Sequence, residues 1–318
     1  MTGIRRILLT GGHGFIGSHL TRALLREGYE VGLLRRETSD LSRVREYGSR
    51  IFHYPADLRD PASVQGAVEA ARPDAIVHLA MYYAVEHHPE ELGVMMDTNV
   101  KGAIALLDAC QDRRLSLFLN TSTCAVYREK NEPLKETDPV SPQNLYALTK
   151  LQAEDACRFY NERLGVPTAT LRLFPPYGPG DNERRLLPYT IRSLLEGQDI
   201  KLTTGLQEWD FVYVDDIVAA FLAALSKPEK AVEAGVLNVG TGYPHSVREV
   251  VSKVHEMTGS KGNLLWGAVE HRKNEVWYNS GSFRRIQSVL GWEPRYTLDE
   301  GLLRTIGWFR DHPGSGKG

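Results

Sequence analysis

Short apolar runs alternate with longer amphipathic stretches over the first half of the chain. The amphipathic stretches have helical periodicity, and Asp60-Pro61 and Gly28 are typical of a helix start and a helix end. Strands that alternate with helices predict right-handed crossovers and a doubly wound parallel sheet with helices on both faces. The expected fold class is therefore α/β. The predicted strands are, in chain order, 5–10, 31–34, 51–54, 75–80, 115–120 and 168–174.

This rhythm changes near residue 174. The segment FPPYGPGDNERR is rich in Pro and Gly, and shorter, mixed elements follow it. Two later apolar segments, WDFVYVDDIVAAFLAAL and VLNVG, have the character of the main sheet again. We therefore expect a large domain over 1–174 that 209–240 rejoins, and a smaller mixed lobe over 175–208 and 241–312. The glycine-rich end, 313–318, is expected to be a frayed tail.

The composition narrows the classes of function. The chain of 318 residues is 42% hydrophobic and 25% charged with a net charge of −2, which argues against a nucleic-acid or membrane surface. Its three cysteines have no CxxC spacing, so we expect a reducing compartment and a cytoplasmic protein. No apolar stretch approaches the roughly 20 residues of a membrane span. The histidines, including the pair His87-His88, lack metal-ligand spacing, so no metal is predicted.

A glycine-rich turn follows the first predicted strand. The segment TGGHGFIG places Gly11, Gly14 and Gly17 between that strand and a helix, with Phe15 and Ile16 in the same turn. In this context one glycine turns the chain, another admits a pyrophosphate to the backbone, and the third lets helix and sheet pack closely. The N–H groups at the helix start then bind phosphate. The turn predicts a dinucleotide site.

Two arginines end the second predicted strand. A dinucleotide site usually has an acidic residue there for the ribose hydroxyls, whereas arginine suits a 2′-phosphate. Arg35 and Arg36 occupy this place in LLRRETSD, and arginine is a natural bidentate ligand of phosphate. The hypothesis is a preference for NADP over NAD. The alternatives left open are NAD and a solvated basic turn without a binding role.

The next two strand ends are also expected to face the dinucleotide. Residues after the third strand are placed to touch an adenine ring, although a carboxylate there can equally cap a turn. A small residue after the fourth strand lets the cofactor lie close, and the residues beyond it face the substrate. These expected contacts are Asp57 and Leu58, then Leu79 and Ala80, then Met81 and Tyr82.

A tyrosine and a lysine lie four residues apart in the segment SPQNLYALTK. Residues at i and i+4 share one helix face, so the Tyr146 phenol and the Lys150 ammonium can share a site. A nearby cation favours the phenolate and so lowers the pKa of a tyrosine. The pair is therefore a candidate proton donor and acceptor for an alcohol or a ketone.

Taken together, these motifs resemble the extended short-chain dehydrogenase/reductase family of nucleotide-sugar-modifying enzymes. The resemblance covers nearly the whole chain. It implies a Rossmann-type domain, a nicotinamide dinucleotide, a nucleotide-diphosphate sugar between the lobes, and a homodimer formed through helices near 91–113 and 143–164. The motifs that carry it are the glycine turn, DL, HLA, TNVKG, STCAVY, YALTK, LRLFPPYGPG, WDFVYVDD and LGWEP.

The resemblance also implies roles for individual residues. Tyr146 would be the acid/base, and Lys150 would hold the nicotinamide ribose and lower the pKa of the tyrosine. Thr123, four residues before Tyr127, would hydrogen-bond the reacting oxygen, and Asn99 would support the helix behind the site. Cys124 is expected to pack rather than to act as a nucleophile, because hydride chemistry needs none.

The short polar segment STCAVY, residues 122–127, which we call the knot, indicates the type of reaction. Sugar 4,6-dehydratases of this family carry Thr-Asp-Glu where this chain has Thr123, Cys124 and Ala125, so we expect no dehydratase. The first expectation is a 4-ketoreductase of a nucleotide-linked 4-keto-6-deoxyhexose, because Arg35 and Arg36 suit exchangeable NADPH. The alternative is a 4-epimerase with tightly bound NAD, and a reductase of non-sugar ketones stays open as well.

Two departures from the family pattern concern the substrate. The family commonly has Asn before YGP and Arg in RDF, both at the diphosphate, whereas this chain has Pro175 and Trp209. Arg272 is therefore the main candidate for phosphate recognition. Trp209 would stack on the base or the sugar, with packing an equal alternative, and Tyr177 of the YGP motif is also assigned to the substrate.

Overall fold

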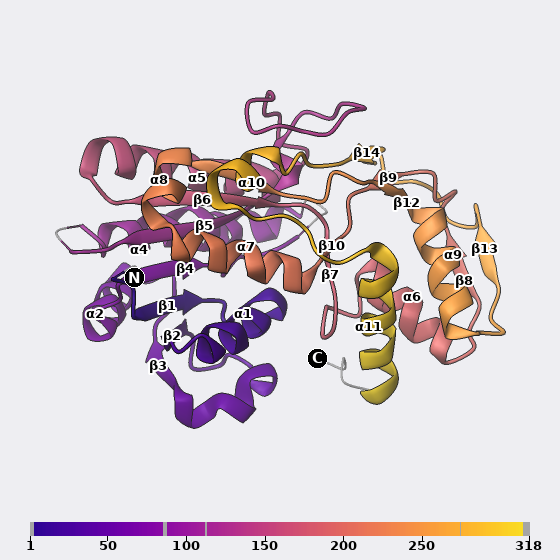
Figure 1. Ribbon diagram of the computed structural model, residues 1–318, viewed down its shortest axis with the longest axis horizontal. Helices are drawn as coiled ribbons and strands as arrows, with labels where there is room; N and C mark the ends of the chain where they lie inside the picture. Colours follow the sequence, from indigo (N-terminus) through magenta and orange to yellow (C-terminus); the bar gives the residue numbers. More distant parts are fainter. Residues whose placement is uncertain (1–2, 85–87, 112, 274, 314–318) are drawn as a thin grey trace.

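A parallel seven-stranded sheet forms the centre of the protein. The computed structural model describes residues 3–84, 88–111, 113–273 and 275–313, so His87 and residues 314–318 of the predicted tail lie outside it. The strand order is β11-β6-β5-β4-β1-β2-β3 (Figure 1). The strands are β1 (Arg6–Thr10), β2 (Glu30–Arg35), β3 (Ile51–Pro55), β4 (Ala75–His78), β5 (Leu117–Thr123), β6 (Thr168–Leu173) and β11 (Val236–Val239). The predicted doubly wound α/β fold is confirmed.

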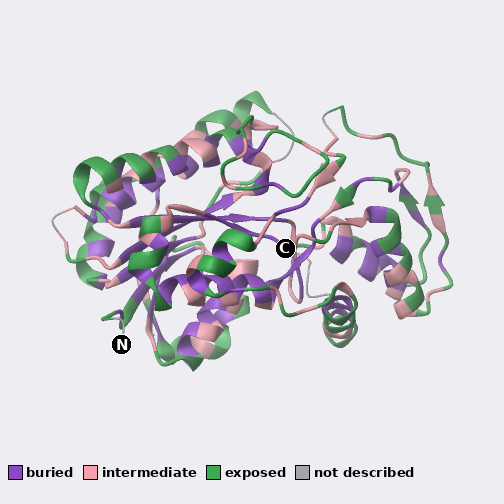
Figure 2. Cartoon of the chain, turned by 45° about the horizontal axis from the view of Figure 1, so that its top comes forward, coloured by how far each residue is buried: buried purple, intermediate pink, exposed green. Residues whose placement is uncertain are grey.

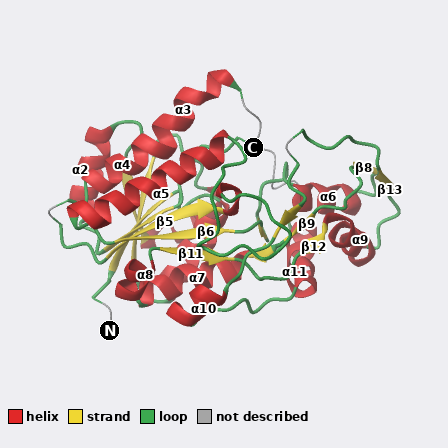
Figure 3. Ribbon diagram, turned by 90° about the horizontal axis from the view of Figure 1, so that it is seen from above, coloured by secondary structure: helices red, strands yellow, loops and turns green. Residues whose placement is uncertain are grey.

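Helices cover both faces of this sheet (Figure 3). Successive residues of a strand point to opposite faces. Leu9 of β1 accordingly packs into one buried cluster and Leu8 into another, and Figure 2 shows the buried interior between the layers. The first face carries α1 (Phe15–Arg26), α7 (Val214–Ser226), α8 (Pro228–Ala234) and α10 (Arg284–Leu290). The second carries α2 (Pro61–Ala71), α4 (Gly102–Asp108) and α5 (Leu145–Leu164), and α3 (Leu92–Met96) precedes α4.

A smaller lobe lies beside the carboxyl ends of the strands, at the right of Figure 1. Its core contains Ile191, Val250 and Ile306 from three helices, α6 (Leu186–Leu195), α9 (Val247–Thr258) and α11 (Leu298–Asp311). Its short strands are β7 (Pro176–Tyr177), β8 (Ile200–Leu202), β9 (Glu208–Trp209), β10 (Val212–Tyr213), β12 (His245–Ser246), β13 (Leu264–Trp266) and β14 (Tyr278–Asn279). They pair as β10-β7, β12-β9-β14 and β13-β8.

The division between the lobes differs from the expected one at two places. As expected, α7 and β11 return to the main domain, but Trp209 lies in β9 of the small lobe. The segment around α10, expected in the small lobe, packs into the main core through Ile286 and Leu290. Trp292 fixes this return, because its indole Nε1 donates to the Asp216 carbonyl of α7 at 2.9 Å. Apolar pattern alone does not say which core an apolar segment joins.

The sheet topology places a crevice at the carboxyl ends of β1 and β4. Strand order reverses between these neighbours, because β2 and β3 lie on one side of β1 whereas β4, β5 and β6 lie on the other. In open α/β sheets, ligands bind at such a switch point. Among the described residues, no helix is long and apolar enough to cross a membrane. All three cysteines are buried and carry free thiols.

Candidate active site

The glycine turn forms a close-packed cradle at the end of β1. Gly11 has φ +68°, and a Cβ there would lie 2.8 Å from the backbone N of Ala80. A Cβ at Gly17 would lie 2.1 Å from the Gly11 carbonyl oxygen, so α1 can approach the turn only without that atom. Helix α1 starts directly after Gly14, which leaves its first N–H groups facing the crevice. These features fit a dinucleotide pyrophosphate.

Phe15 and Ile16, the two large apolar residues of the turn, contribute packing. Both are partly buried against the core of the small lobe, and Ile16 also contacts the main core. The Phe15 ring meets the His19 ring edge-on with centroids 5.8 Å apart. The backbone of this turn therefore faces the dinucleotide site, while its large side chains join the two lobes.

Three arginines gather beside the turn. Arg35 donates from Nη1 to the Arg36 carbonyl at 2.9 Å, and Arg43 donates to the Gly180 carbonyl at 3.1 Å. Burial lowers the pKa of His13, and Arg36, Arg35 and Arg43 lower it further. Within the described residues, His13 Nδ1 is buried without a partner. Arg43 comes from the short 3-10 helix η1 (Ser42–Arg50), and sequence analysis missed it.

Asp57 and Leu58, the residues expected at the adenine, already contact other residues of the protein. The Asp57 carboxylate is held by its neighbour Arg59, whose Nη2 donates at 2.6 Å, and this pairing lowers the pKa of Asp57. Leu58 is buried against Gly102, where a Cβ would lie 2.8 Å from Leu58 Cβ. Asp57 therefore presents a paired carboxylate at the strand end.

Tyr146 lies in a closed part of the crevice. Helix α5 begins after Asn144, whose Oδ1 accepts from the Ala147 N–H at 2.8 Å. The Tyr146 side chain is 7% exposed, its hydroxyl donates to Met81 Sδ at 3.1 Å, and the Tyr83 ring stands edge-on to it. Met81, predicted to contact the substrate, and Tyr146, predicted to be the acid/base, are therefore in contact. Tyr83 is a further neighbour of Tyr146 that the sequence did not indicate. A substrate hydroxyl would replace the sulfur as the acceptor.

The pKa of Tyr146 is shifted in the direction opposite to the expected one. The sequence predicted that Lys150 would lower the pKa of this tyrosine. Instead, burial raises the pKa of Tyr146, and Tyr83 and Cys124 raise it further. The cation that lowers this pKa is Arg185, at the start of α6, and not Lys150. Desolvation outweighs the nearby charges, so Tyr146 is a proton donor in this state.

Lys150 is a buried cation on the same helix. It is 2% exposed, and burial lowers its pKa to about 8, although the Glu154 carboxylate acts in the opposite direction. Within the described residues, no acidic side chain forms an ion pair with Lys150. Its ammonium is therefore available to a ligand in the crevice.

The knot at the end of β5 supplies a hydroxyl and a neutral thiol. Thr123 Oγ1 accepts from the Ala125 N–H at 3.2 Å at the start of the 3-10 helix η4 (Cys124–Val126), and its hydroxyl also interacts with the Cys124 thiol. Cys124 Sγ accepts from Asn279 Nδ2 at 3.1 Å, and burial raises the pKa of this thiol to about 11. A thiol that stays protonated and hydrogen-bonded agrees with packing rather than nucleophilic attack.

Asn99 connects the strand end at Tyr82 to α5. It is buried in the π-helical turn η3 (Asp97–Lys101), where Oδ1 accepts from the Tyr82 N–H at 2.7 Å. Its Nδ2 donates to the Tyr82 carbonyl at 2.9 Å and to Thr149 Oγ1 at 3.0 Å. The Tyr82 hydroxyl itself donates to Glu91. Asn99 therefore fixes the segment after β4 against the helix that carries Tyr146 and Lys150.

The small lobe contributes residues other than those expected. Tyr177 is buried beneath α11, with its hydroxyl toward the Leu298 carbonyl, and Trp209 Nε1 donates to the Val276 carbonyl at 2.9 Å. The structure therefore does not bring Tyr177 to the crevice, and it uses the Trp209 N–H for packing. Arg272 is exposed on a loop. The lobe groups that act near Tyr146 and Cys124 are Arg185 and Asn279.

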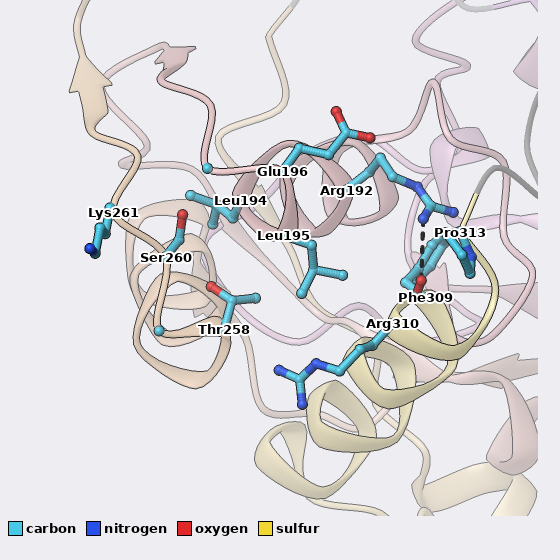
Figure 4. Close-up of a pocket in the computed structure, with 12 residues that line it drawn as sticks. Arg192, Leu194, Leu195, Glu196, Thr258, Ser260, Lys261, Phe309, Arg310 and Pro313 are labelled. Carbon is cyan, nitrogen blue, oxygen red and sulfur yellow. Dashed lines mark hydrogen bonds between the residues drawn. The ribbon is translucent and has the colours of Figure 1, made fainter.

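Another hollow, of about 660 Å³, lies at the far ends of α6, α9 and α11 (Figure 4). Arg192 crosses it and donates from Nη1 to the Phe309 carbonyl at 3.2 Å. None of the residues predicted for the site lines this hollow. Among the described residues, no group of three or more His, Cys, Asp or Glu side chains could hold a metal ion.

Comparison with known proteins gives consistent matches. A family model described as the NAD dependent epimerase/dehydratase family matches residues 7–240. The UDP-glucose 4-epimerase of Thermus thermophilus, solved with NAD, is 29% identical, with 98% of this chain and 99% of that chain covered and a TM-score of 0.87. The UDP-glucose 4-epimerase of Thermotoga maritima, solved with UDP-glucose, is 27% identical, with 96% and 98% covered and a TM-score of 0.87. CDP-abequose synthase of Salmonella typhimurium is 29% identical, with 93% of this chain and 95% of that protein covered.

The buried charge of Lys150 predicts a pH-dependent cost in stability. Its pKa is lowered from 10.5 to about 8 on folding, so the unfolded chain binds more protons between these values and wild-type stability rises with pH in this window. Replacement Lys150→Met removes the charge. The advantage of the variant in free energy of unfolding should be about 3 kcal/mol larger at pH 7 than at pH 10.5. Urea unfolding of both proteins at both pH values measures it.

A matched control for this measurement is Lys201→Met. Lys201 is exposed on β8, so its replacement should change the free energy of unfolding equally at the two pH values. An advantage of Lys150→Met that stays constant from pH 7 to pH 10.5 would show that Lys150 is not a desolvated cation.

Proposed function

Because the chain belongs to the NAD dependent epimerase/dehydratase family, we propose that it is a nucleotide-sugar 4-epimerase. The family and the architecture make it an enzyme. The sequence favours a 4-ketoreductase, with a 4-epimerase as the alternative. The similar structures are UDP-glucose 4-epimerases, so we now place the 4-epimerase first. The observation that carries the proposal is Tyr146 beside a neutral knot, in which Thr123, Cys124 and Ala125 supply no carboxylate for elimination, and the likeness to 4-epimerases favours epimerisation over simple reduction.

In this proposal each residue of the crevice has one task. A bound nicotinamide dinucleotide would supply the hydride chemistry at C4 of the sugar. In the reduction step the protonated Tyr146 gives its proton to the C4 oxygen, because its hydroxyl rests on a weak sulfur acceptor that a sugar oxygen would displace. In the oxidation step the phenolate form of Tyr146 takes the proton of the C4 hydroxyl. Thr123 donates its hydroxyl proton in a hydrogen bond to the same oxygen and orients it. Lys150 holds a ribose hydroxyl and offsets the charge of the phenolate.

The same knot argues against elimination of water. A 4,6-dehydratase needs an acid and a base at the two positions after the threonine. Cys124 stays a protonated thiol, because burial raises its pKa to about 11, and Ala125 has no ionisable group. The chain therefore lacks the acid/base groups for water loss at this place, and the chemistry stays at C4.

The diphosphate of the substrate requires cations other than the family's usual ones. Pro175 stands where an asparagine is common, and its carbonyl accepts from the Val212 N–H at 2.9 Å. We propose that Arg185 and Arg272 supply positive charge to the anionic part of the substrate. Arg185 has a fixed orientation, because its Nη1 donates to the buried Asp181 carboxylate at 3.1 and 3.2 Å.

A second candidate function is the 4-ketoreductase. The observation that favours it is the arginine cluster beside the glycine turn, since a 2′-phosphate marks the dinucleotide that usually serves exchangeable reduction. A 4-epimerase regains its dinucleotide in each turnover, so the cluster is compatible with either reaction. We propose NADP as the preferred cofactor. The similar structure from Thermus thermophilus contains NAD, so NAD remains the alternative.

Cofactor preference follows from the cluster of Arg35, Arg36 and Arg43. Wild-type protein should bind NADP at least about tenfold more tightly than NAD, because each charge-assisted phosphate contact is worth about 1.5–3 kcal/mol. Arg35→Asp and Arg36→Asp should abolish this preference, whereas Arg45→Asp, which changes an exposed arginine of the same short helix as Arg43, should keep it. Fluorescence titration gives both affinities. Tighter binding of NAD, unchanged in Arg35→Asp, would refute the proposal.

The proposed reaction predicts interconversion of UDP-glucose and its C4 epimer without an added reductant. Tyr146→Phe should lower kcat by about 10²- to 10⁴-fold, the usual contribution of a positioned acid/base. Tyr189→Phe, on an exposed tyrosine of α6, should leave kcat unchanged. Turnover only of a 4-keto-6-deoxy nucleotide sugar with NADPH would select the second candidate, and no turnover of either substrate would contradict both.

A homodimer through α4 and α5 is also proposed. Leu148 and Phe159 are exposed on α5, and they lie eleven residues apart, which is about three helical turns and so the same face. Sedimentation velocity should show a dimer for the wild type and a monomer for Phe159→Glu, because a charge would be buried at the contact. Leu303→Glu, on the exposed side of α11, should remain a dimer. A monomeric wild type would contradict this prediction.

A further inference from the structure

A buried ion pair lies one helical turn beyond Lys150. Glu154 of α5 accepts from Arg172 Nη2 of β6 at 2.6 Å and from Arg172 Nε at 3.0 and 3.2 Å. The two side chains are 5% and 6% exposed. This bidentate geometry occupies both carboxylate oxygens.

Arg172 is held on its other side by the knot. Its guanidinium lies 4.6 Å from the ring centroid of Tyr127, the last residue of STCAVY. The Tyr127 hydroxyl donates to Asn238 Oδ1 of β11 at 2.7 Å. The ion pair is therefore fixed between α5, the knot and the edge strand of the sheet, which leaves Arg172 little freedom to turn away from Glu154.

The spacing of Lys150 and Glu154 would ordinarily produce a different pair. Oppositely charged residues at i and i+4 of a helix attract each other, and the attraction is strong inside a protein. Yet within the described residues Lys150 has no acidic partner, while Glu154 is fully engaged by Arg172. Of the two cations near it, Glu154 therefore forms its ion pair with Arg172 and not with Lys150.

The other titratable groups around Lys150 stay neutral. Burial lowers the pKa of His78, on β4, to about 3, and burial raises the pKa of Cys157, on α5, to about 12. Tyr146 is protonated as well, because its pKa is raised. Among the described residues around Lys150, Glu154 is therefore the formal charge that acts on the ammonium, and it raises the pKa of Lys150.

We propose that Arg172 is a positioning residue for Lys150. By holding Glu154 in a bidentate pair, it keeps that carboxylate from drawing the ammonium back along α5, away from Tyr146 and the dinucleotide ribose. The inference rests on the proposed function, because it assumes that Lys150 serves a bound dinucleotide.

The test is the pH dependence of dinucleotide affinity, measured by titration from pH 6 to 10. Affinity should fall as Lys150 loses its charge, so the alkaline limb reports its ionisation. In Arg172→Gln the freed Glu154 captures the ammonium, which should move the limb up by about one pH unit and weaken binding below it about tenfold. In Glu154→Gln the loss of the carboxylate that raises the pKa of Lys150, which also leaves Arg172 unpaired, should move the limb down by about one unit. The double variant should return close to the wild-type limb.

Opposite shifts distinguish positioning from support of the fold. If the pair only stabilised the structure, all three variants would bind more weakly with an unmoved limb, which would overturn the inference. Should Arg172→Gln fail to fold, the limbs of Glu154→Gln and of the double variant still decide. Arg192→Gln breaks the Arg192–Glu183 pair of the small lobe, whose atoms are 2.8 Å apart, and should leave the limb in place. A wild type that binds no dinucleotide would instead contradict the proposed function itself.

Discussion

Burial of the Lys150 ammonium is the constraint on which the rest of the crevice depends. A charge in the interior is costly, and burial lowers the pKa of the Lys150 ammonium to about 8. Among the described residues, the adjacent Glu154 carboxylate forms its ion pair with Arg172 and not with this ammonium. The cation also requires a firm backbone around it, which Asn99 and Thr149 provide by connecting α5 to the segment after β4. The Lys150 ammonium therefore keeps its hydrogen-bond donors for a ligand that binds in the crevice.

The charged and the neutral side chains of the crevice occupy different parts of it. Cations gather at the dinucleotide end beside the glycine turn and, through Arg185, on the lobe side, where a phosphate-bearing substrate would need them. Between these two ends the groups other than the Lys150 ammonium are neutral: the Cys124 thiol, the Thr123 hydroxyl and the protonated Tyr146. This arrangement suits transfer of a proton and a hydride at one carbon. It does not suit elimination, which needs a carboxylate near the leaving hydroxyl.

Much of the dinucleotide half could be predicted from the sequence because its signals are local. Strand length, helical period and a glycine turn all lie within a few neighbouring residues, so the parallel sheet and the cradle at Gly11 followed from them. The lobe side was predicted less well. Tyr177 belongs to a recognisable motif, but the motif does not say which side of β7 its ring occupies, and the ring packs beneath α11.

Other site residues carry no local signal at all. Arg43, Arg185 and Asn279 reach the crevice from a 3-10 helix, a helix start and a short strand that are far apart in the chain, and only the fold brings them near His13, Tyr146 and Cys124. The run NERR before α6 was the one hint for Arg185. The pKa of Tyr146 was mispredicted for a related reason, since i and i+4 spacing reports proximity but not desolvation.

The central claim, that the chain moves a hydride away from and back to C4 of a nucleotide sugar, is tested most directly with a substrate that carries deuterium at C4. Proton NMR of the equilibrated mixture should show both C4 epimers with the deuterium retained at C4 and no exchange with solvent, because the hydride stays within the closed crevice between the two steps. Loss of the label to water, or an epimer formed without the label at C4, would contradict the account.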